Sequence, residues 1–140
     1  MGYRSDVRIR LTDEGYERLQ KFVKVGMEQI NLERRMNHEC ELGNVLDEAD
    51  FVVRNSDTAY IGWNDIKWYD CPQFDDCADI TIVSRGLQAL EKDDIPYRFS
   101  RIGEDYTDIE EVVSNTSHEG DLDYIQITRK FDDDANAGCC

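Results

Sequence analysis

Five carboxylates stand close together in the stretch RIGEDYTDIEEVV, which covers residues 101–113: Glu104, Asp105, Asp108, Glu110 and Glu111. Carboxylate oxygens can coordinate a divalent cation, and a concentration of negative charge can bind a basic surface on another protein. Acids can also stabilise the first turn of a helix. Asp93 and Asp94, some ten residues earlier, extend this acidic region. We take these seven residues as the candidate partner-binding site.

Part of this acidity has a structural explanation in the sequence. The segment from Thr107 to Glu110 matches a capping box, in which a threonine and a glutamate satisfy each other's backbone N–H groups. The pattern predicts a short helix from Asp108 to about Ser114, with Ile109, Val112 and Val113 facing the core. Glu104 and Asp105 lie before this helix and have no capping role, so they are the first acids to test.

A second group of residues could bind an anion instead. Arg98, Arg101 and Arg129 fall on predicted strands, with His118 nearby, and arginine binds carboxylate and phosphate groups through paired hydrogen bonds. The alternative function is therefore a small-ligand domain that binds a nucleotide or a divalent metal. The competing explanation is that these arginines pair with the surrounding acids, which are in excess.

Metal and enzyme patterns are otherwise missing from the sequence. The spacing of His38, Cys40, Cys71 and Cys77 differs from that of recurrent zinc sites, and the acidic stretches do not match an EF-hand loop. The chain has neither a phosphate-binding glycine loop nor a nucleophile elbow, and two histidines leave few bases for a catalytic triad. We therefore expect no cofactor, no metal site and no catalytic activity.

Composition and charge favour a folded acidic protein that binds proteins and not nucleic acid. The 140 residues include 31 acids against 16 Lys and Arg, a formal net charge of −15. All of this excess lies in residues 36–140, because residues 1–35 are slightly basic. Such a field repels nucleic acid and anionic membranes while attracting basic surfaces. Acidity that only keeps the protein in solution is the alternative. The sequence shows neither a signal peptide nor a membrane span, so we expect the cytoplasm.

The periodicity of apolar residues predicts an α+β fold. We expect strands near residues 7–12, 50–55, 58–70, 97–102 and 121–131. We expect helices over 13–30, within 31–50, from 75 or 76 to about 92, and over 108–114. This order suits a single antiparallel or mixed sheet with helices packed mainly on one face, and a ferredoxin-like variant is one possibility. Homo-oligomers are compatible with it.

The sequence predicts one domain over residues 1–131 and a flexible acidic tail over residues 132–140. The tail ends in Cys139 and Cys140, and a terminal cysteine pair is similar to the prenylated ends of some small GTPases. The chain lacks their phosphate-binding loop, and three aspartates at 132–134 would repel an anionic membrane. We therefore interpret the tail as an end without a lipid.

Three segments of the chain carry a resemblance to a known group of proteins: MGYRSDV at the N-terminus, IKWYD in the middle, and YRFSRIGEDYTDIEEV. Together they resemble small accessory proteins of tailed bacteriophages and prophages. The likeness extends over most of residues 1–131, and the stretch 31–50 and the Cys-Cys end fall outside the similar segments.

That group has no settled activity, so the resemblance implies provenance and no catalytic residues. It implies an accessory protein acting in the cytoplasm of a bacterial host. Many small acidic phage proteins bind and block host machinery such as CRISPR effectors and other nucleic-acid enzymes. Resemblance and charge together predict an inhibitor of a host defence or nucleic-acid-handling protein, and a structural role in the virion is a further alternative.

Overall fold

Five strands form one antiparallel sheet in the computed structural model, which describes residues 4–68, 78–105, 107–118, 122–128, 130–131 and 133–137. The strands are β1 (Ser5–Thr12), β2 (Phe51–Arg54), β3 (Thr58–Ile66), β4 (Tyr97–Gly103) and β5 (Ile109–Val113), and their order in the sheet is β2-β3-β1-β4-β5. Because β1 pairs with both β3 and β4, it lies at the centre. β2 and β5 are the edge strands.

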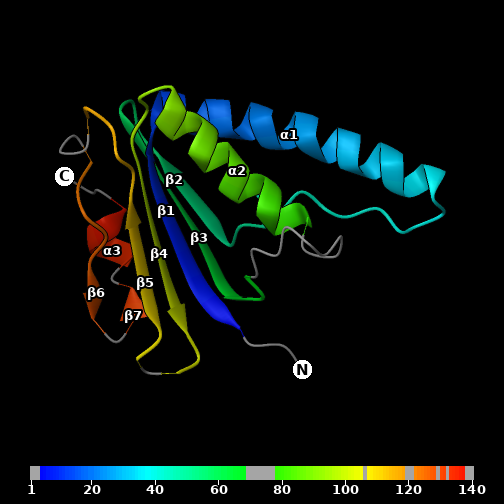
Figure 1. Cartoon of the computed structure of the whole chain (residues 1–140). Coiled ribbons are helices and arrows are strands. Elements are labelled where there is room, and N and C mark those ends of the chain that lie inside the picture. The colour runs from blue at the N-terminus through cyan, green and yellow to red at the C-terminus, as the bar shows by residue number, and fades with distance from the viewer. Residues whose placement is uncertain are drawn as a thin grey trace.

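Two helices, α1 (Asp13–Met36) and α2 (Ala78–Lys92), cover one face of this sheet (Figure 1). Along the chain the elements follow the order β1-α1-β2-β3-α2-β4. Within the sheet, the order of these four strands is β2-β3-β1-β4. This is the arrangement of a ferredoxin-like fold, to which β5 adds a fifth strand. The predicted class, α+β with one antiparallel sheet and helices on one face, is confirmed.

The main core lies between the sheet and the helices. Val7, Ile9 and Leu11 alternate along β1 and point toward Leu19 and Val23 of α1, and all five are fully buried. The alternation follows from the two-residue repeat of a strand, which sends every second side chain to the same face. Charged residues therefore occupy the other face of β1, where Arg8 and Arg10 lie.

Helix α1 begins where the sequence predicts and ends later. Thr12 Oγ1 accepts a hydrogen bond from the Gly15 N–H at 2.9 Å, which satisfies one donor of the first turn. The helix continues six residues past the expected Ile30 to Met36, and His38 then adopts a positive φ of 58° that ends the helical path. Its C-terminal half projects beyond the sheet (Figure 1).

The helix expected within residues 31–50 is not present, because α1 takes the first part and residues 37–50 form turns and irregular chain. Val45 and Leu46 are buried nonetheless, and the Trp63 Nε1–H donates to the Val45 carbonyl at 2.8 Å. The loop therefore buries Val45 and Leu46 without forming the predicted helix.

The short helix expected over residues 108–114 is also wrong, since these residues form strand β5. Residues 109–113 pair with β4 from Ile102 opposite Ile109 to Arg98 opposite Val113. The capping box does not form, and Thr107 bonds to Asp105 instead, through its N–H and its hydroxyl, each at 2.9 Å. Three of the five residues are β-branched, which favours a strand.

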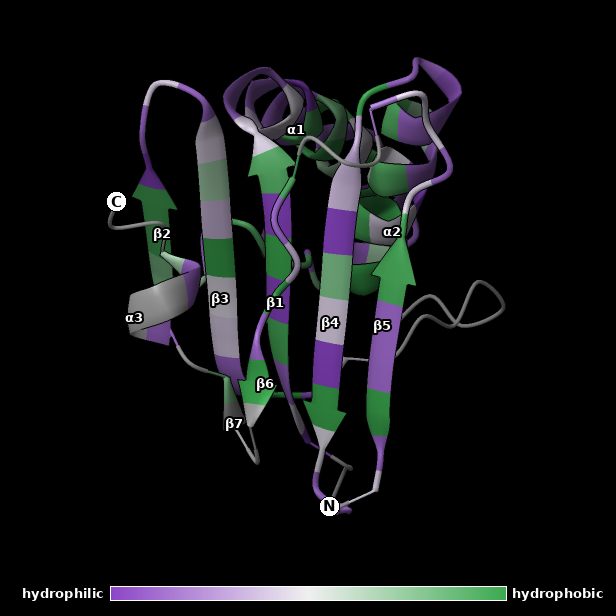
Figure 2. Ribbon diagram, turned by 90° about the vertical axis from the view of Figure 1, so that its left-hand side faces the viewer, coloured by the Kyte–Doolittle hydropathy of each residue, from purple (hydrophilic) through white to green (hydrophobic). Residues whose placement is uncertain are grey.

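The long strand expected over residues 121–131 is replaced by two short strands, β6 (Ile127–Thr128) and β7 (Lys130–Phe131), which pair in a separate small sheet. They lie with α3 (Asp133–Asn136) on the sheet face opposite the helices (Figure 2). There Ile125 and Phe131 pack against Tyr60 of β3 in a second, smaller core.

Residues 133–137, which belong to the predicted tail, include α3, and this short helix makes hydrogen bonds with the sheet. Asp133 accepts hydrogen bonds from Arg8 Nε at 2.8 Å and from Arg8 Nη2 at 3.0 Å. Asn136 is buried, and its carbonyl accepts a bond from Arg10. Cys139 and Cys140 lie outside the described residues.

Candidate functional site

The acidic stretch lies on the hairpin that joins β4 to β5. Glu104 accepts a hydrogen bond from the Arg4 backbone N–H at 2.8 Å. Asp105 closes the turn by accepting from Thr107, and hydrogen bonds from the Thr107 N–H and hydroxyl lower the pKa of Asp105. Glu104 and Asp105 therefore each accept local hydrogen bonds, and both side chains remain exposed.

Arg101 binds two of the acids. Its Nη2 and Nη1 donate to the two carboxylate oxygens of Asp108 at 2.8 and 3.0 Å, and its Nε donates to Glu110 at 3.2 Å. The hydrogen bonds to Asp108, joined by those to Glu110, raise the pKa of Arg101 although its partial burial acts in the other direction. Arg101 thus neutralises part of the acidic stretch and fixes β5 to β4.

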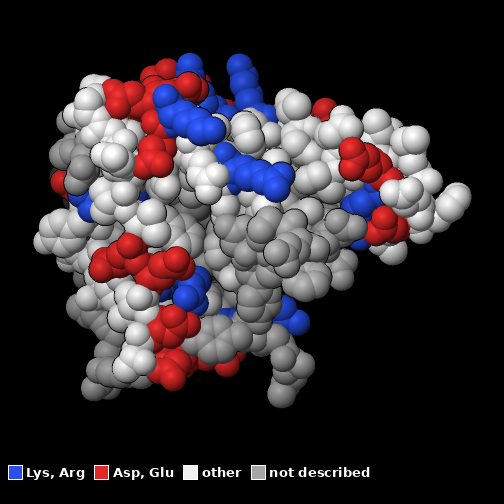
Figure 3. Space-filling model, viewed as in Figure 1, with Lys and Arg blue, Asp and Glu red and all other residues white. Residues whose placement is uncertain are grey.

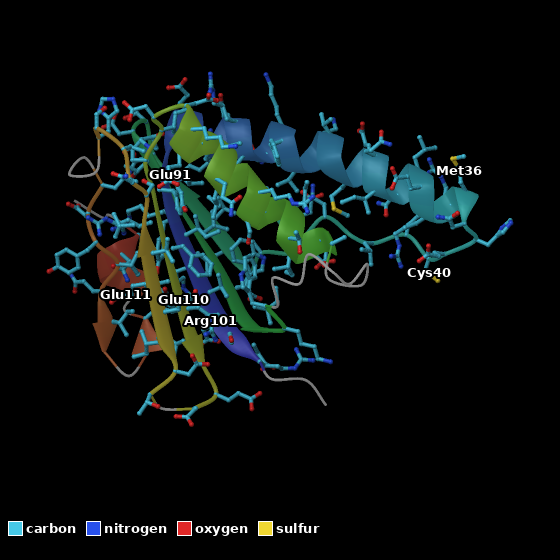
Figure 4. All side chains as sticks on the ribbon, in the orientation of Figure 1. Met36, Cys40, Glu91, Arg101, Glu110 and Glu111 are labelled. Carbon is cyan, nitrogen blue, oxygen red and sulfur yellow. The ribbon has the colours of Figure 1, made fainter. Side chains whose placement is uncertain are left out.

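Glu111 differs from its neighbours, since no described residue forms an ion pair or a side-chain hydrogen bond with it. It lies opposite Ser100 and is exposed, as are all five residues of β5. Figure 4 shows Glu110 and Glu111 on β5, with Arg101 close by on β4. Acidic side chains gather over this side of the molecule in Figure 3. Glu111 is therefore an acid available to a partner.

Asp93 and Asp94 do not join this patch. They follow the end of α2, at the start of β4, whereas Glu104 follows the end of β4, and a seven-residue strand spans roughly 20 Å. Asp93 pairs with Arg18 at 3.0 Å. Asp94 accepts a bond from the Ser117 N–H at 2.8 Å, and the bonds from Ser117 lower its pKa. The seven predicted acids therefore form two separate groups.

The structure does not bring the alternative anion-binding residues together. Arg98 and Arg101 are three apart on β4, so they point to opposite faces of the sheet. Arg98 Nε donates to the Leu122 carbonyl at 3.0 Å, and His118 lies 3.5 Å from Asp94, which precedes β4 and is far from Arg101. Arg129 lies outside the described residues.

Among the described residues, no cluster of three or more His, Cys, Asp or Glu has the geometry to hold a metal ion. Cys40 is a free, exposed thiol on the loop after α1, and Figure 4 places it near Met36 at the projecting end of that helix. Cys71 and Cys77 fall outside the described residues.

Sequence reasoning missed a row of arginines on the face opposite the helices. Arg8 and Arg10 expose 3% and 6% of their surface, and Arg10 lies directly opposite Arg98 across β1 and β4. Burial lowers the pKa of Arg10, with Tyr60 and Asp123 acting against that effect. The strict alternation of VRIRL placed both arginines on one face, but nothing in it indicated that the C-terminal segment would cover them.

Neither a protein-family model, nor a curated protein, nor a solved structure matches this chain in the comparisons with known proteins. No helix in the described parts of the chain combines the length and apolar character needed to cross a bilayer. The fold and the site together define an α+β protein with an acidic β4–β5 hairpin that ends in an exposed edge strand.

Proposed function

We propose that this protein is a non-catalytic interaction protein that binds a basic surface on a host protein. We further propose that it thereby inhibits a defence or nucleic-acid-handling activity of that host protein. The observation that carries the proposal is the exposed strand β5, whose Glu111 presents a carboxylate without a partner among the described residues. The resemblance to phage accessory proteins supports the host setting.

Charge supports the proposed class of partner. A net charge of −15 accelerates encounter with a basic protein and slows encounter with nucleic acid. Surfaces that hold the phosphates of nucleic acid are basic, so an acidic strand can compete for them. Inhibition then follows from occupation of that surface and needs no catalytic group.

The test compares two single charge reversals that change the net charge equally. Glu111→Lys alters the proposed binding strand, whereas Glu28→Lys alters an exposed position on α1. Immobilised wild-type protein and both variants are used to capture proteins from bacterial lysate at low and high salt, with identification by mass spectrometry.

We expect a basic, nucleic-acid-handling protein to bind the wild type and the Glu28→Lys variant, and to bind the Glu111→Lys variant about tenfold less. Binding should weaken as salt rises, because screening reduces attraction between exposed charges. Equal capture by both variants would refute the proposed surface, and capture that salt does not affect would refute the role of charge.

A further inference from the structure

We infer that β5 holds its partner by strand addition: an extended segment of the partner pairs with the open edge of β5 and adds a sixth strand to the sheet. The inference rests on the proposed function, since it specifies the kind of segment that the acidic strand binds. An edge strand offers backbone N–H and C=O groups for such pairing.

The register identifies which backbone groups are open. The Gly103 N–H donates to the Asp108 carbonyl at 2.8 Å and the Ser114 N–H to the Tyr97 carbonyl at 3.1 Å, one at each end of the β4–β5 pairing. Hydrogen-bonded and non-bonded pairs alternate in an antiparallel ladder. Glu110 and Val112 therefore bond to β4, and Glu111 and Val113 direct their N–H and C=O groups away from it.

Apolar side chains flank these groups. Ile109, Val112 and Val113 expose 46%, 37% and 41% of their surface, which is high for large apolar residues in a strand. Alternation places Ile109, Glu111 and Val113 on one face and Glu110 and Val112 on the other. A partner strand would cover apolar surface on both faces, as well as completing the backbone hydrogen bonds.

Glu110 and Glu111 disfavour the pairing of β5 with β5 of a second copy of the chain. In antiparallel self-pairing, the register that joins all five residues of β5 places Glu111 opposite Glu111 of the other copy, and like charges directly opposite destabilise a sheet. A basic segment has the opposite effect. An antiparallel partner should read, from its N-terminus, apolar, apolar, basic, basic, apolar, with the basic residues opposite Glu111 and Glu110.

The other edge strand suits such a segment less well. β2 has four residues, and one of them is Arg54, which forms ion pairs with Asp13 at 2.7 Å and with Glu17 at 3.2 Å. A basic strand would meet this arginine with its two acids at the β2 edge, and at the β5 edge it would meet Glu111, together with Glu110, which Arg101 already binds. The greater length of β5 and the carboxylate of Glu111, which has no ion pair among the described residues, therefore favour β5.

The test uses the peptide acetyl-Thr-Val-Val-Lys-Arg-Val-Thr-amide with the full-length protein. Its matched control carries an N-methyl group on the lysine backbone nitrogen, which keeps both charges and removes the N–H that would bond to Glu111. A second control replaces Lys-Arg with Glu-Glu. On the protein side, Val113→Pro removes an outward N–H without changing charge, and Val113→Thr keeps it.

Strand addition predicts that the peptide binds, that N-methylation and Val113→Pro each weaken binding at least about fivefold, and that Val113→Thr binds like the wild type. The Val113→Pro variant must keep the melting temperature of the wild type within a few degrees, and if it does not, the N-methylated peptide alone decides. Equal affinity of the Lys-Arg peptide and its N-methylated form would overturn strand addition. The absence of binding at millimolar peptide would overturn it too, as would a dimer formed through β5 in analytical sedimentation.

The controls separate this inference from the proposed function. If the basic peptides bind equally and lose affinity with salt or with Glu111→Lys, the acidic surface stands and strand addition fails. If the Glu-Glu peptide binds as well as the Lys-Arg peptide, the role of charge in the proposed function fails.

Discussion

Arg101 on β4 lies directly opposite Glu110 on β5, and its Nε donates a hydrogen bond to that carboxylate at 3.2 Å. The same guanidinium holds Asp108 through two further bonds. The pairing separates the acidic stretch into residues that stabilise the hairpin and one, Glu111, that faces solvent without an ion pair among the described residues. Arg101 therefore ties Asp108 and Glu110 to β4, whereas Glu111 is left for the proposed partner.

Arg101→Gln should destabilise the hairpin. The variant leaves Asp108 and Glu110 close together without a cation, so we expect a loss of about 1–2 kcal/mol in the free energy of unfolding, measured by urea denaturation. The control is Arg35→Gln, which removes the ion pair between Arg35 and Glu41, two side chains that are each more than half exposed. This control should cost less than about 0.5 kcal/mol in the free energy of unfolding. Equal losses for the two variants would contradict the role given to Arg101.

Deletion of residues 132–140 should destabilise the whole protein. The deletion removes Asp133 and Asn136, which accept hydrogen bonds from the buried Arg8 and Arg10. Leaving a buried cation unpaired costs about 3–5 kcal/mol, so the melting temperature should fall by more than 10 °C for a domain of this size. An unchanged melting temperature would instead fit a tail that makes no contact with the sheet.

The contact between Arg8 and Asp133 should weaken in acid. Burial by itself would raise the pKa of Asp133, but the hydrogen bonds from Arg8 and Tyr60 outweigh it, and the pKa lies below its ordinary value. A lowered pKa in the folded state means that ionised Asp133 stabilises the fold. This contribution is present above the pKa of the unfolded chain, about 3.9, and is lost as pH falls through the lower folded pKa.

The measurement is the difference in unfolding free energy between wild type and Asp133→Asn at pH 7 and at pH 3. We expect the wild type to be more stable at pH 7 by about 1–3 kcal/mol, and the difference to shrink at pH 3. Taking the difference cancels the titration of the other carboxylates. A difference that stays constant with pH would show that ionisation of Asp133 is not linked to folding.

Much of the fold was predictable because its signals are local. Alternation in VRIRLT and the three- and four-residue spacing from Tyr16 to Met27 marked β1 and α1, and their burial follows those patterns. In the segment 109–113, the spacing of Ile109, Val112 and Val113 matches one face of a helix, while their β-branched side chains favour a strand. The preceding strand and the short turn from 104 to 108 also favour a hairpin, and the pairing with β4 overrides the capping pattern.

The site was less predictable, because it depends on contacts distant in sequence. The pairing of Arg101 with Asp108 and Glu110 follows from the β4–β5 register, and the separation of Asp94 from Glu104 follows from the length of β4. The contact of Arg8 with Asp133 spans 125 residues. No local pattern marks such partners, so the acids of RIGEDYTDIEEVV could be counted in the sequence but not assigned to separate roles.

Amide hydrogen exchange along β5 tests the central claim most directly, measured residue by residue in the free protein and with the Lys-Arg peptide bound. We predict that Glu110 and Val112 exchange slowly in both states, because their N–H groups bond to β4. Glu111 and Val113 should exchange quickly in the free protein and slowly in the complex. A complex that forms while Glu111 and Val113 continue to exchange quickly would contradict strand addition at this edge.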